Sequence, residues 1–233
     1  MDNSKILGKL KGKLIVSCQA LEGEPFHGAE MMAKMALAAE QGGAEGIRSN
    51  GYEDIVAIRK VTKLPIIGLI KRRYENSSVY ITPTKREIDA LLKAGVNVIA
   101  LDCTKRKRPN GEKLQDLIPY IQNHNTLVLA DISTIDEGLD ALDLGVDCVS
   151  TTLSGYTEYT NTGRTKPDFK LVEELTKQTR CPVFAEGRIN TPQEAKQMLE
   201  KGAHAVIVGT AITRPQLITK AFVEGINEKS LKA

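Results

Sequence analysis

The sequence predicts a (β/α)8 barrel, an α/β fold in which eight parallel strands close into a ring surrounded by helices. Three observations along the 233 residues point to it. Short runs rich in valine, isoleucine and leucine alternate with longer amphipathic segments. Most of these runs lack polar–apolar alternation, which is typical of parallel strands covered on both faces. No linker divides the chain, so we expect residues 1–233 to form a single domain.

The predicted strands are eight apolar runs, which span residues 14–19, 46–50, 65–71, 98–104, 127–133, 148–153, 182–189 and 205–212. The segments between them are long enough for the helices that connect successive parallel strands. A strand followed by a helix therefore repeats from one end of the chain to the other.

A weak internal repeat supports closure of the barrel. Gly43, Gly95, Gly145 and Gly202 each follow an expected helix and precede a strand, at similar spacing. This place suits a residue in the left-handed region that ends a helix. Repetition of paired βα units favours a barrel over an open doubly wound sheet, which usually carries G-x-G-x-x-G after its first strand. The sequence contains no such motif there.

Three helix starts carry a capping-box pattern, in which a threonine and an acid or amide three residues later satisfy the first backbone N–H groups. They are Thr84–Glu87, Thr191–Glu194 and Thr213–Gln216. Two connections, 72–83 and 154–167, are unusually long and follow strand ends. Such segments are either lids over an active site or solvated surface loops, and both interpretations stay open.

Polar residues at the carboxyl ends of the strands converge on one mouth of a barrel, where active sites lie. Read in order, they are Gln19, Arg48, Lys71, Asp102, Asp131, Thr151, Glu186 and Gly209. Any one of them could simply mark where a strand meets water. Several charges of both signs at equivalent places indicate a function, because burying them costs free energy.

The last two predicted strands end in glycine turns of the kind that bind phosphate. Gly187 and Arg188 follow the seventh run, and Gly209 and Thr210 follow the eighth, with Arg214 at the start of the next expected helix. Backbone N–H groups, a helix N-terminus and an arginine fork all favour a phosphate group.

Lys71 ends an apolar strand and is followed by Arg72 and Arg73. Loss of hydration and neighbouring cations both lower the pKa of a lysine, so we expect Lys71 to serve as a general base or a Schiff-base nucleophile. Glu186 is its expected acid or base partner. The alternative for Glu186 is an ion pair with Arg48 or Arg188, and for Lys71 it is simple exposure to solvent.

Other classes of partner find little support. The net charge of +3 is modest, and the run 105–108 lacks interleaved aromatic residues, so we expect no nucleic acid as partner. No segment has the pattern of a signal peptide or membrane span, and four widely spaced cysteines suit a reduced cytoplasmic protein without disulfides. We expect no cofactor and no metal, although Asp102, Asp131 and Glu186 could in principle share one.

The motifs GIRSNG (46–51), LPIIGLIKR (64–72), ALDCTKRKRPNG (100–111), TLSGYT (152–157) and FAEGRINTP (184–192) together closely resemble the bacterial N-acetylmannosamine-6-phosphate 2-epimerase family. The similarity runs in order through nearly the whole chain. It implies a cytoplasmic TIM barrel, a homodimer, that converts N-acetylmannosamine 6-phosphate to N-acetylglucosamine 6-phosphate in sialic acid breakdown.

The resemblance also implies roles for particular residues. Lys71 becomes the catalytic lysine and Glu186 its carboxylate partner, while Gln19, Arg48 and Asp131 contact the sugar. Arg106 and Arg108 become loop structure or charge at the mouth. Removal of the C2 proton, which the neighbouring aldehyde acidifies, and its return to the other face would need no redox cofactor.

Three other functions remain to be separated from this one. A Schiff-base aldolase of the same fold would use Lys71 to form an imine. Another phosphate-binding barrel isomerase or a biosynthetic barrel enzyme would carry different residues at the strand ends. A ligand-binding regulator would bind a phosphorylated compound without converting it.

Overall fold

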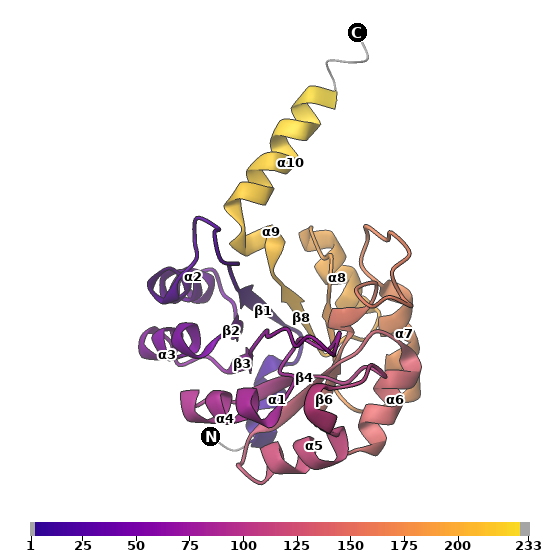
Figure 1. Cartoon of the computed structure of the whole chain (residues 1–233). Coiled ribbons are helices and arrows are strands. Elements are labelled where there is room, and N and C mark those ends of the chain that lie inside the picture. The colour runs from indigo at the N-terminus through magenta and orange to yellow at the C-terminus, as the bar shows by residue number, and fades with distance from the viewer. Residues whose placement is uncertain (1–2, 229–233) are drawn as a thin grey trace.

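A computed structural model describes residues 3–228 and contains eight parallel strands hydrogen-bonded in sequence order into a closed barrel (Figure 1). The strands are β1 (Lys13–Cys18), β2 (Gly46–Asn50), β3 (Ile66–Leu69), β4 (Val98–Asp102), β5 (Leu127–Asp131), β6 (Cys148–Ser150), β7 (Val183–Glu186) and β8 (Ala205–Val208). The predicted (β/α)8 fold is therefore confirmed, and all eight strands of the described residues belong to one closed barrel.

Several strands are shorter than predicted at their carboxyl ends. The run 65–71 forms a strand only over Ile66–Leu69, and in the run 148–153 the residues Thr151–Leu153 form a 3-10 helix, η2. After Leu69 and Ser150 the chain leaves the hydrogen-bonded ladder at the carboxyl end of the barrel. The residues that follow the strands are thus free to line a site.

Helices follow the strands and surround the barrel. They are α2 (Ala29–Gln41), α3 (Tyr52–Val61), α4 (Lys85–Ala94), α5 (Leu114–Gln122), α6 (Ile135–Asp143), α7 (Phe169–Gln178), α8 (Pro192–Glu200), α9 (Thr210–Thr213) and α10 (Pro215–Glu228), with a 3-10 turn, η1 (Pro109–Gly111), after β4. The four repeat glycines after α2, α4, α6 and α8 all have positive φ, from 74° at Gly95 to 94° at Gly202. The prediction of left-handed helix ends is confirmed.

Two of the three expected capping boxes form, at Thr84–Glu87 and Thr191–Glu194, and an unexpected third forms at Thr134–Glu137. The prediction for Thr213–Gln216 is wrong. Thr213 ends α9, and its hydroxyl donates to the carbonyl oxygens of Ser17 and Gly209, each at 3.1 Å. The hydroxyl therefore fixes α9 against β1 and does not cap α10.

Helix α1 (Asn3–Leu10), which the sequence analysis did not predict, closes the amino-terminal end of the barrel. Its Ile6 and Leu10 are buried and join the cluster of side chains inside the barrel, which includes Ile15 and Phe184. His204 Nε2 lies 2.8 Å from the carbonyl oxygen of Leu7 and fastens the helix to the start of β8. The interior below the site is thus packed.

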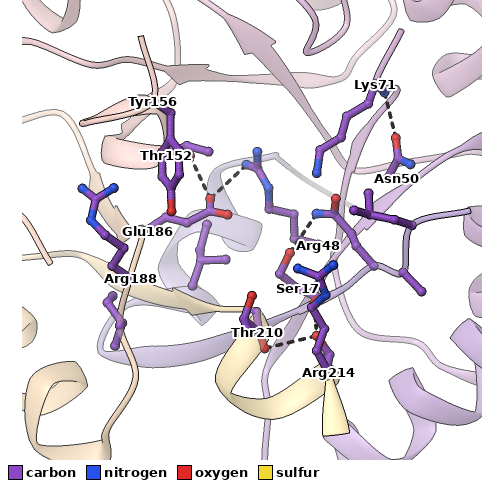
Figure 2. A pocket seen from close by; sticks show the side chains of 18 of the residues that line it. Ser17, Arg48, Asn50, Lys71, Thr152, Tyr156, Glu186, Arg188, Thr210 and Arg214 are labelled. Carbon is purple, nitrogen blue, oxygen red and sulfur yellow. Dashed lines mark hydrogen bonds and ion pairs between the residues drawn. The ribbon is translucent and has the colours of Figure 1, made fainter. Parts of the chain in front are cut away.

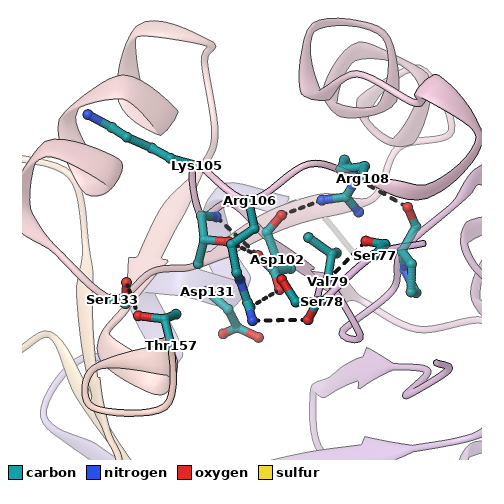
Figure 3. Close-up of polar contacts among 12 residues, drawn as sticks. Ser77, Ser78, Val79, Asp102, Lys105, Arg106, Arg108, Asp131, Ser133 and Thr157 are labelled. Atoms are coloured by element: carbon teal, nitrogen blue, oxygen red, sulfur yellow. Dashed lines mark hydrogen bonds and ion pairs between the residues drawn. The ribbon is translucent and has the colours of Figure 1, made fainter. Parts of the chain in front are cut away.

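The basic run 105–108 is largely structural (Figure 3). Arg106 donates to Asp102 Oδ2 at 2.6 Å and to the Ser78 carbonyl oxygen at 3.0 Å. Buried Arg108 donates to the carbonyl oxygens of Asp102, Thr82 and Pro83. These arginines hold segment 72–83 on the barrel, as loop structure requires.

The cysteines, a membrane span and a metal site were also considered in the sequence. All four cysteines are free, and three are buried. Burial raises the pKa of the Cys18 thiol to about 12, so it stays protonated. Within residues 3–228, no helix combines the length and apolarity needed to span a membrane, and histidines, cysteines and acids form no cluster of three suited to a metal.

Gly68 of β3 offers a test of how tightly the barrel packs against its helices. A Cβ atom there would lie 2.5 Å from Val96 Cγ1 and 3.0 Å from Leu91 Cδ2. Gly68→Ala should lower the free energy of unfolding by about 1–3 kcal/mol through overpacking, measured by urea denaturation. The control is Gly8→Ala in α1, where a Cβ would meet nothing within 4 Å. Equal stability of the two variants would contradict the packing described.

Candidate active site

A pocket of about 470 Å³ opens at the carboxyl ends of the strands (Figure 2). Of the predicted site residues, all but Asp131 line it, namely Gln19, Arg48, Lys71, Glu186, Gly187, Arg188, Gly209, Thr210 and Arg214. They come from segments scattered through the chain, and the barrel brings them together because all its strands are parallel.

Arg48 of β2 is the buried centre of the site, with only 1% of its side chain exposed. Its Nη1 donates to Asp131 Oδ1 at 3.1 Å and its Nη2 to Asp131 Oδ2 at 2.7 Å, which is a two-pronged ion pair. Its Nη1 also lies 3.3 Å from Glu186 Oε2. One guanidinium therefore faces two carboxylates, as the ion-pair alternative for Glu186 anticipated.

Asp131, at the end of β5, lies beneath the pocket wall and is fully buried. Besides Arg48, it accepts a hydrogen bond from Thr152 Oγ1 at 2.7 Å. In this structure Asp131 therefore contacts Arg48 rather than the pocket space. Asp102, at the end of β4, is likewise occupied, by Arg106 and Thr104.

Lys71 is placed by its backbone. Its N–H donates to Asn50 Oδ1 at 2.7 Å, and the residue pairs with Ile81 across a short antiparallel bridge. The residue lines the pocket and is exposed to solvent at the mouth, so the expected exposure and the expected place in the pocket both hold. Among the described residues, Nζ has no hydrogen bond or ion pair, so the amine is available to a ligand.

The pKa of Lys71 is lowered, first by loss of hydration in the pocket and then by the positive charge of Arg48 and, more weakly, Arg214; Glu186 and Asp131 oppose the shift. The expected direction is thus confirmed, but the expected cations are wrong. Arg72 forms an ion pair with Glu87 at 3.0 Å instead.

Glu186, the last residue of β7, has 15% of its side chain exposed, toward the pocket. Burial raises its pKa; Arg48 opposes that shift and the nearby negative charge of Asp131 adds to it. Thr151 holds the Glu186 backbone, since its hydroxyl contacts both the N–H and the carbonyl oxygen at about 3 Å. The carboxyl group therefore faces the pocket on a fixed backbone.

The expected phosphate residues form the wall on the side of β7 and β8. Gly187 has φ of 108°, and Arg188 has φ of 56°, which is unusual for a residue with a side chain. Arg188 donates to the carbonyl oxygens of Lys166 and Ser154, and its guanidinium lies 4.8 Å from the ring centre of Tyr156. Arg188 thus anchors segment 154–167 beside the pocket.

Arg214 and Gln19 also line the pocket. Arg214 forms an ion pair with Glu24, and its Nε is buried without a hydrogen-bond partner among the described residues. Gln19 donates to Ser17 Oγ at 2.8 Å, and its Oε1 likewise lacks a partner. Buried polar atoms are normally satisfied, so these two suit contacts with a polar ligand.

The sequence analysis missed several pocket residues, namely Ser17, Glu24, Asn50, Tyr80, Thr152, Tyr156 and Asn190. Ser17 and Asn50 lie within one or two residues of positions that were predicted, so a wider window at each strand end would have found them. Tyr80 and Tyr156 belong to the two long segments, which reach the pocket. Both segments are also packed, since Val79 and Ile81 of 72–83 and Ser154 and Thr157 of 154–167 are buried.

These features are typical of an enzyme of the (β/α)8 class with a site for proton transfer. A lysine of lowered pKa and a carboxyl group of raised pKa share one pocket, around a buried arginine. Groups with pKa values shifted toward neutrality are the usual tools of general acid–base catalysis.

Comparison with known proteins gives the family. Residues 32–228 match the NanE family model, described as "Putative N-acetylmannosamine-6-phosphate epimerase". A relative from Clostridioides difficile named as the corresponding 2-epimerase is 59% identical over 95% of this chain and 99% of its own length. One from Caldanaerobacter subterraneus is 54% identical over 96% and 95%. The chain therefore belongs to the NanE family, whose members are epimerases and thus isomerases.

Solved structures agree. The N-acetylmannosamine-6-phosphate 2-epimerase from Clostridium perfringens superposes with a TM-score of 0.92 at 56% identity, over 94% of this chain and 95% of that one. The thiamine phosphate pyrophosphorylase from Pyrococcus furiosus has a TM-score of 0.60 at 17% identity, over 90% and 92%. The second likeness shows the shared fold alone.

The buried ion pair predicts a large effect of Arg48 on stability. Arg48→Met should lower the free energy of unfolding by about 3–5 kcal/mol, because it leaves Asp131 buried and unpaired. Adding Asp131→Asn should recover part of that loss. Urea denaturation measures both, with the exposed Arg86→Met as control. An Arg48 variant no weaker than this control would contradict the role assigned to the pair.

Proposed function

We propose that the protein inverts C2 of N-acetylmannosamine 6-phosphate to give N-acetylglucosamine 6-phosphate, by removal and return of the C2 proton through an enolate. The observation that carries the proposal is the placing of Lys71 and Glu186 around Arg48 in one pocket, together with membership of the NanE family. We place the reaction in the cytoplasm, on amino sugars released from sialic acid.

Lys71 is the proposed base. In the open-chain sugar the C1 aldehyde acidifies the C2 proton, and a neutral amine can remove it. The enolate oxygen then carries negative charge, which fixed polar groups at the pocket must stabilise. Arg48 supplies a permanent positive charge that acts on Lys71, and Asp131 acts through Arg48 by holding its orientation.

Gly187, Gly209 and Thr210 are the proposed contacts of the 6-phosphate, with Arg188 and Arg214 as the neighbouring cations. Arg214 would exchange its pairing with Glu24 for the phosphate, whose charge is larger. Gln19 Oε1, which lacks a donor, suits a hydroxyl or amide N–H of the sugar. Binding energy from these groups would position C2 against Lys71.

A Schiff-base aldolase is the alternative that the free amine of Lys71 keeps open. Borohydride added with a keto or aldehyde substrate would trap an imine, and mass spectrometry would locate it on Lys71. A barrel that binds the sugar phosphate without turnover would instead show saturable binding and no product. An isomerase acting on another sugar phosphate would turn over that compound and leave this one unchanged.

Epimerisation has a direct readout in heavy water. Proton NMR with N-acetylmannosamine 6-phosphate in D2O should show N-acetylglucosamine 6-phosphate carrying deuterium at C2. Lys71→Met should reduce the rate by about 10²-fold or more, since it removes the base. The exposed Lys63→Met is the matched control. Normal turnover by the Lys71 variant would rule out this assignment.

The pH dependence follows from the lowered pKa of Lys71. Only the neutral amine accepts a proton, so the ascending limb of kcat/KM should rise with pH through the pKa of Lys71. The midpoint of this rise should lie below about 10.4, the ordinary value of a lysine. A rate that is still rising at and above that pH would contradict a perturbed lysine base.

We further propose that the protein is a homodimer, formed through α10. This helix leaves the barrel instead of packing along it (Figure 1). Its large apolar side chains are exposed, including 72% of Phe222, 50% of Val223 and 69% of Ile226. A helix normally buries such a stripe, and a second copy of the chain offers a symmetric way to cover it.

Phe222→Glu with Ile226→Glu should therefore convert the dimer to monomer, because both changes place charge in the apolar contact. Sedimentation velocity at micromolar protein measures the mass. Lys220→Gln, on the polar face of the same helix, should leave the mass of the dimer unchanged. A wild-type protein that sediments as a monomer would overturn this assignment for α10.

A further inference from the structure

Thr152, in η2 after β6, lies between the two carboxyl groups of the site (Figure 2 shows its contact with Glu186). Its Oγ1 is 2.7 Å from Asp131 Oδ1, 2.8 Å from Glu186 Oε2 and 2.8 Å from Ser150 Oγ. All three separations are those of O–H···O hydrogen bonds. The proposed reaction does not assign a role to the Thr152 hydroxyl.

Three short oxygen–oxygen contacts need three hydrogens, and the two hydroxyl groups supply only two. If both carboxyl groups were ionised, Asp131 and Glu186 would compete for the single hydroxyl proton of Thr152. One of the two contacts would then have no hydrogen, and two oxygen lone pairs would face each other. The missing hydrogen therefore belongs to Asp131 or to Glu186.

The surroundings of the two acids decide between them. Both oxygens of Asp131 accept hydrogen bonds from the two-pronged Arg48, an arrangement that requires the ionised form. Glu186 has only the longer approach of Arg48 Nη1 at 3.3 Å. One arginine charge is already matched by Asp131, so an ionised Glu186 would leave the buried cluster with excess negative charge.

We propose that Thr152 is a positioning residue that keeps Glu186 protonated in the ligand-free enzyme, by accepting a hydrogen bond from its carboxylic acid. Thr152 donates its own proton to Asp131, and Ser150 donates to Thr152. The inference rests on the proposed function only for its consequence, which is that Glu186 acts as the acid facing the base Lys71.

With Glu186 protonated, each proton lost or gained in the reaction has a donor and an acceptor. Neutral Lys71 takes the proton from C2 and becomes an ammonium, and the C2–H bond electrons form the enolate. Glu186 gives its proton to the opposite face of C2 and becomes a carboxylate held by Thr152 and Arg48. Return of the proton from Lys71 to Glu186 through solvent restores the starting state.

Several charged or titratable groups face Glu186 and set the background for its titration. Arg48 comes from β2, Asp131 from β5 and Lys71 from the segment after β3. Tyr80 of segment 72–83 and Arg214 after α9 line the same pocket. Thr152→Val leaves all of these side chains in place, and of them Asp131 also loses a hydrogen bond from the Thr152 hydroxyl.

The test is the direction in which the pKa of Glu186 moves in Thr152→Val. Carbon-13 NMR of ligand-free protein labelled at glutamate side-chain carboxyls follows the titration, and Glu186→Gln assigns the signal. If Glu186 donates to Thr152, the variant loses an acceptor for the acid form, and the pKa of Glu186 should fall by about one unit. If Thr152 donates to an ionised Glu186, it should rise instead, which would overturn the proposal.

Controls keep this readout separate from folding and from turnover. Thr152→Ser retains a hydroxyl and should restore the wild-type titration, and Ser150→Ala should leave it nearly unchanged. An unchanged pKa in Thr152→Val, with circular dichroism showing a folded protein, would also overturn the proposal. Should Thr152→Val not fold, a Thr152→Ser titration that departs from wild type would do so.

Turnover gives a second measure. In D2O, Thr152→Val should slow product formation about tenfold or more while kcat falls further than KM changes, and Thr152→Ser should recover most of the rate. Because the titration uses no substrate, a protein that fails to epimerise the sugar phosphate would refute the proposed function without affecting the result for Thr152.

Discussion

A single buried guanidinium organises the carboxyl-terminal end of this barrel. Arg48 of β2 reaches across the interior to Asp131 of β5 and approaches Glu186 of β7, so three strands that are not neighbours share one charge. Carboxylates at this depth need a partner, and the partner in turn needs them. Loss of hydration and then the same positive charge lower the pKa of Lys71, so the buried arginine also influences the chemistry of the mouth.

The two carboxyl groups around Arg48 are not bound equally, and this difference affects the pKa of Glu186. Asp131 accepts hydrogen bonds from both Nη atoms of the guanidinium, whereas Glu186 has one longer approach from Arg48 Nη1 at 3.3 Å. Burial and the negative charge of Asp131 then raise the pKa of Glu186. The pKa of the acid is therefore raised and that of the base lowered in one pocket, and both shifts favour the neutral forms.

The fold and most of the site residues were predictable from the sequence because parallel strands impose a strong pattern. Apolar runs, helix-ending glycines such as Gly95 and polar strand ends such as Glu186 each follow from local rules. The roles of neighbouring residues were harder to predict. Arg72 is adjacent to Lys71 in sequence but pairs with Glu87, while Arg48, distant in sequence, acts on Lys71. Thr152 was missed because the strand ends before it and η2 turns its hydroxyl between two acids. Helix α1 was missed because its few apolar residues make sense only against the barrel floor.

The closed amino-terminal end of the barrel affects how substrate enters and product leaves. Since α1 seals the amino-terminal end of the barrel with Ile6 and Leu10, the site communicates with solvent through its mouth in the part of the molecule described, residues 3–228. Substrate and product then pass through the same pocket opening and occupy the same space in turn. An enzyme so built has no separate exit, so product that accumulates outside competes directly with substrate for the empty pocket. Net flux through it would accordingly depend on whatever reaction consumes the product.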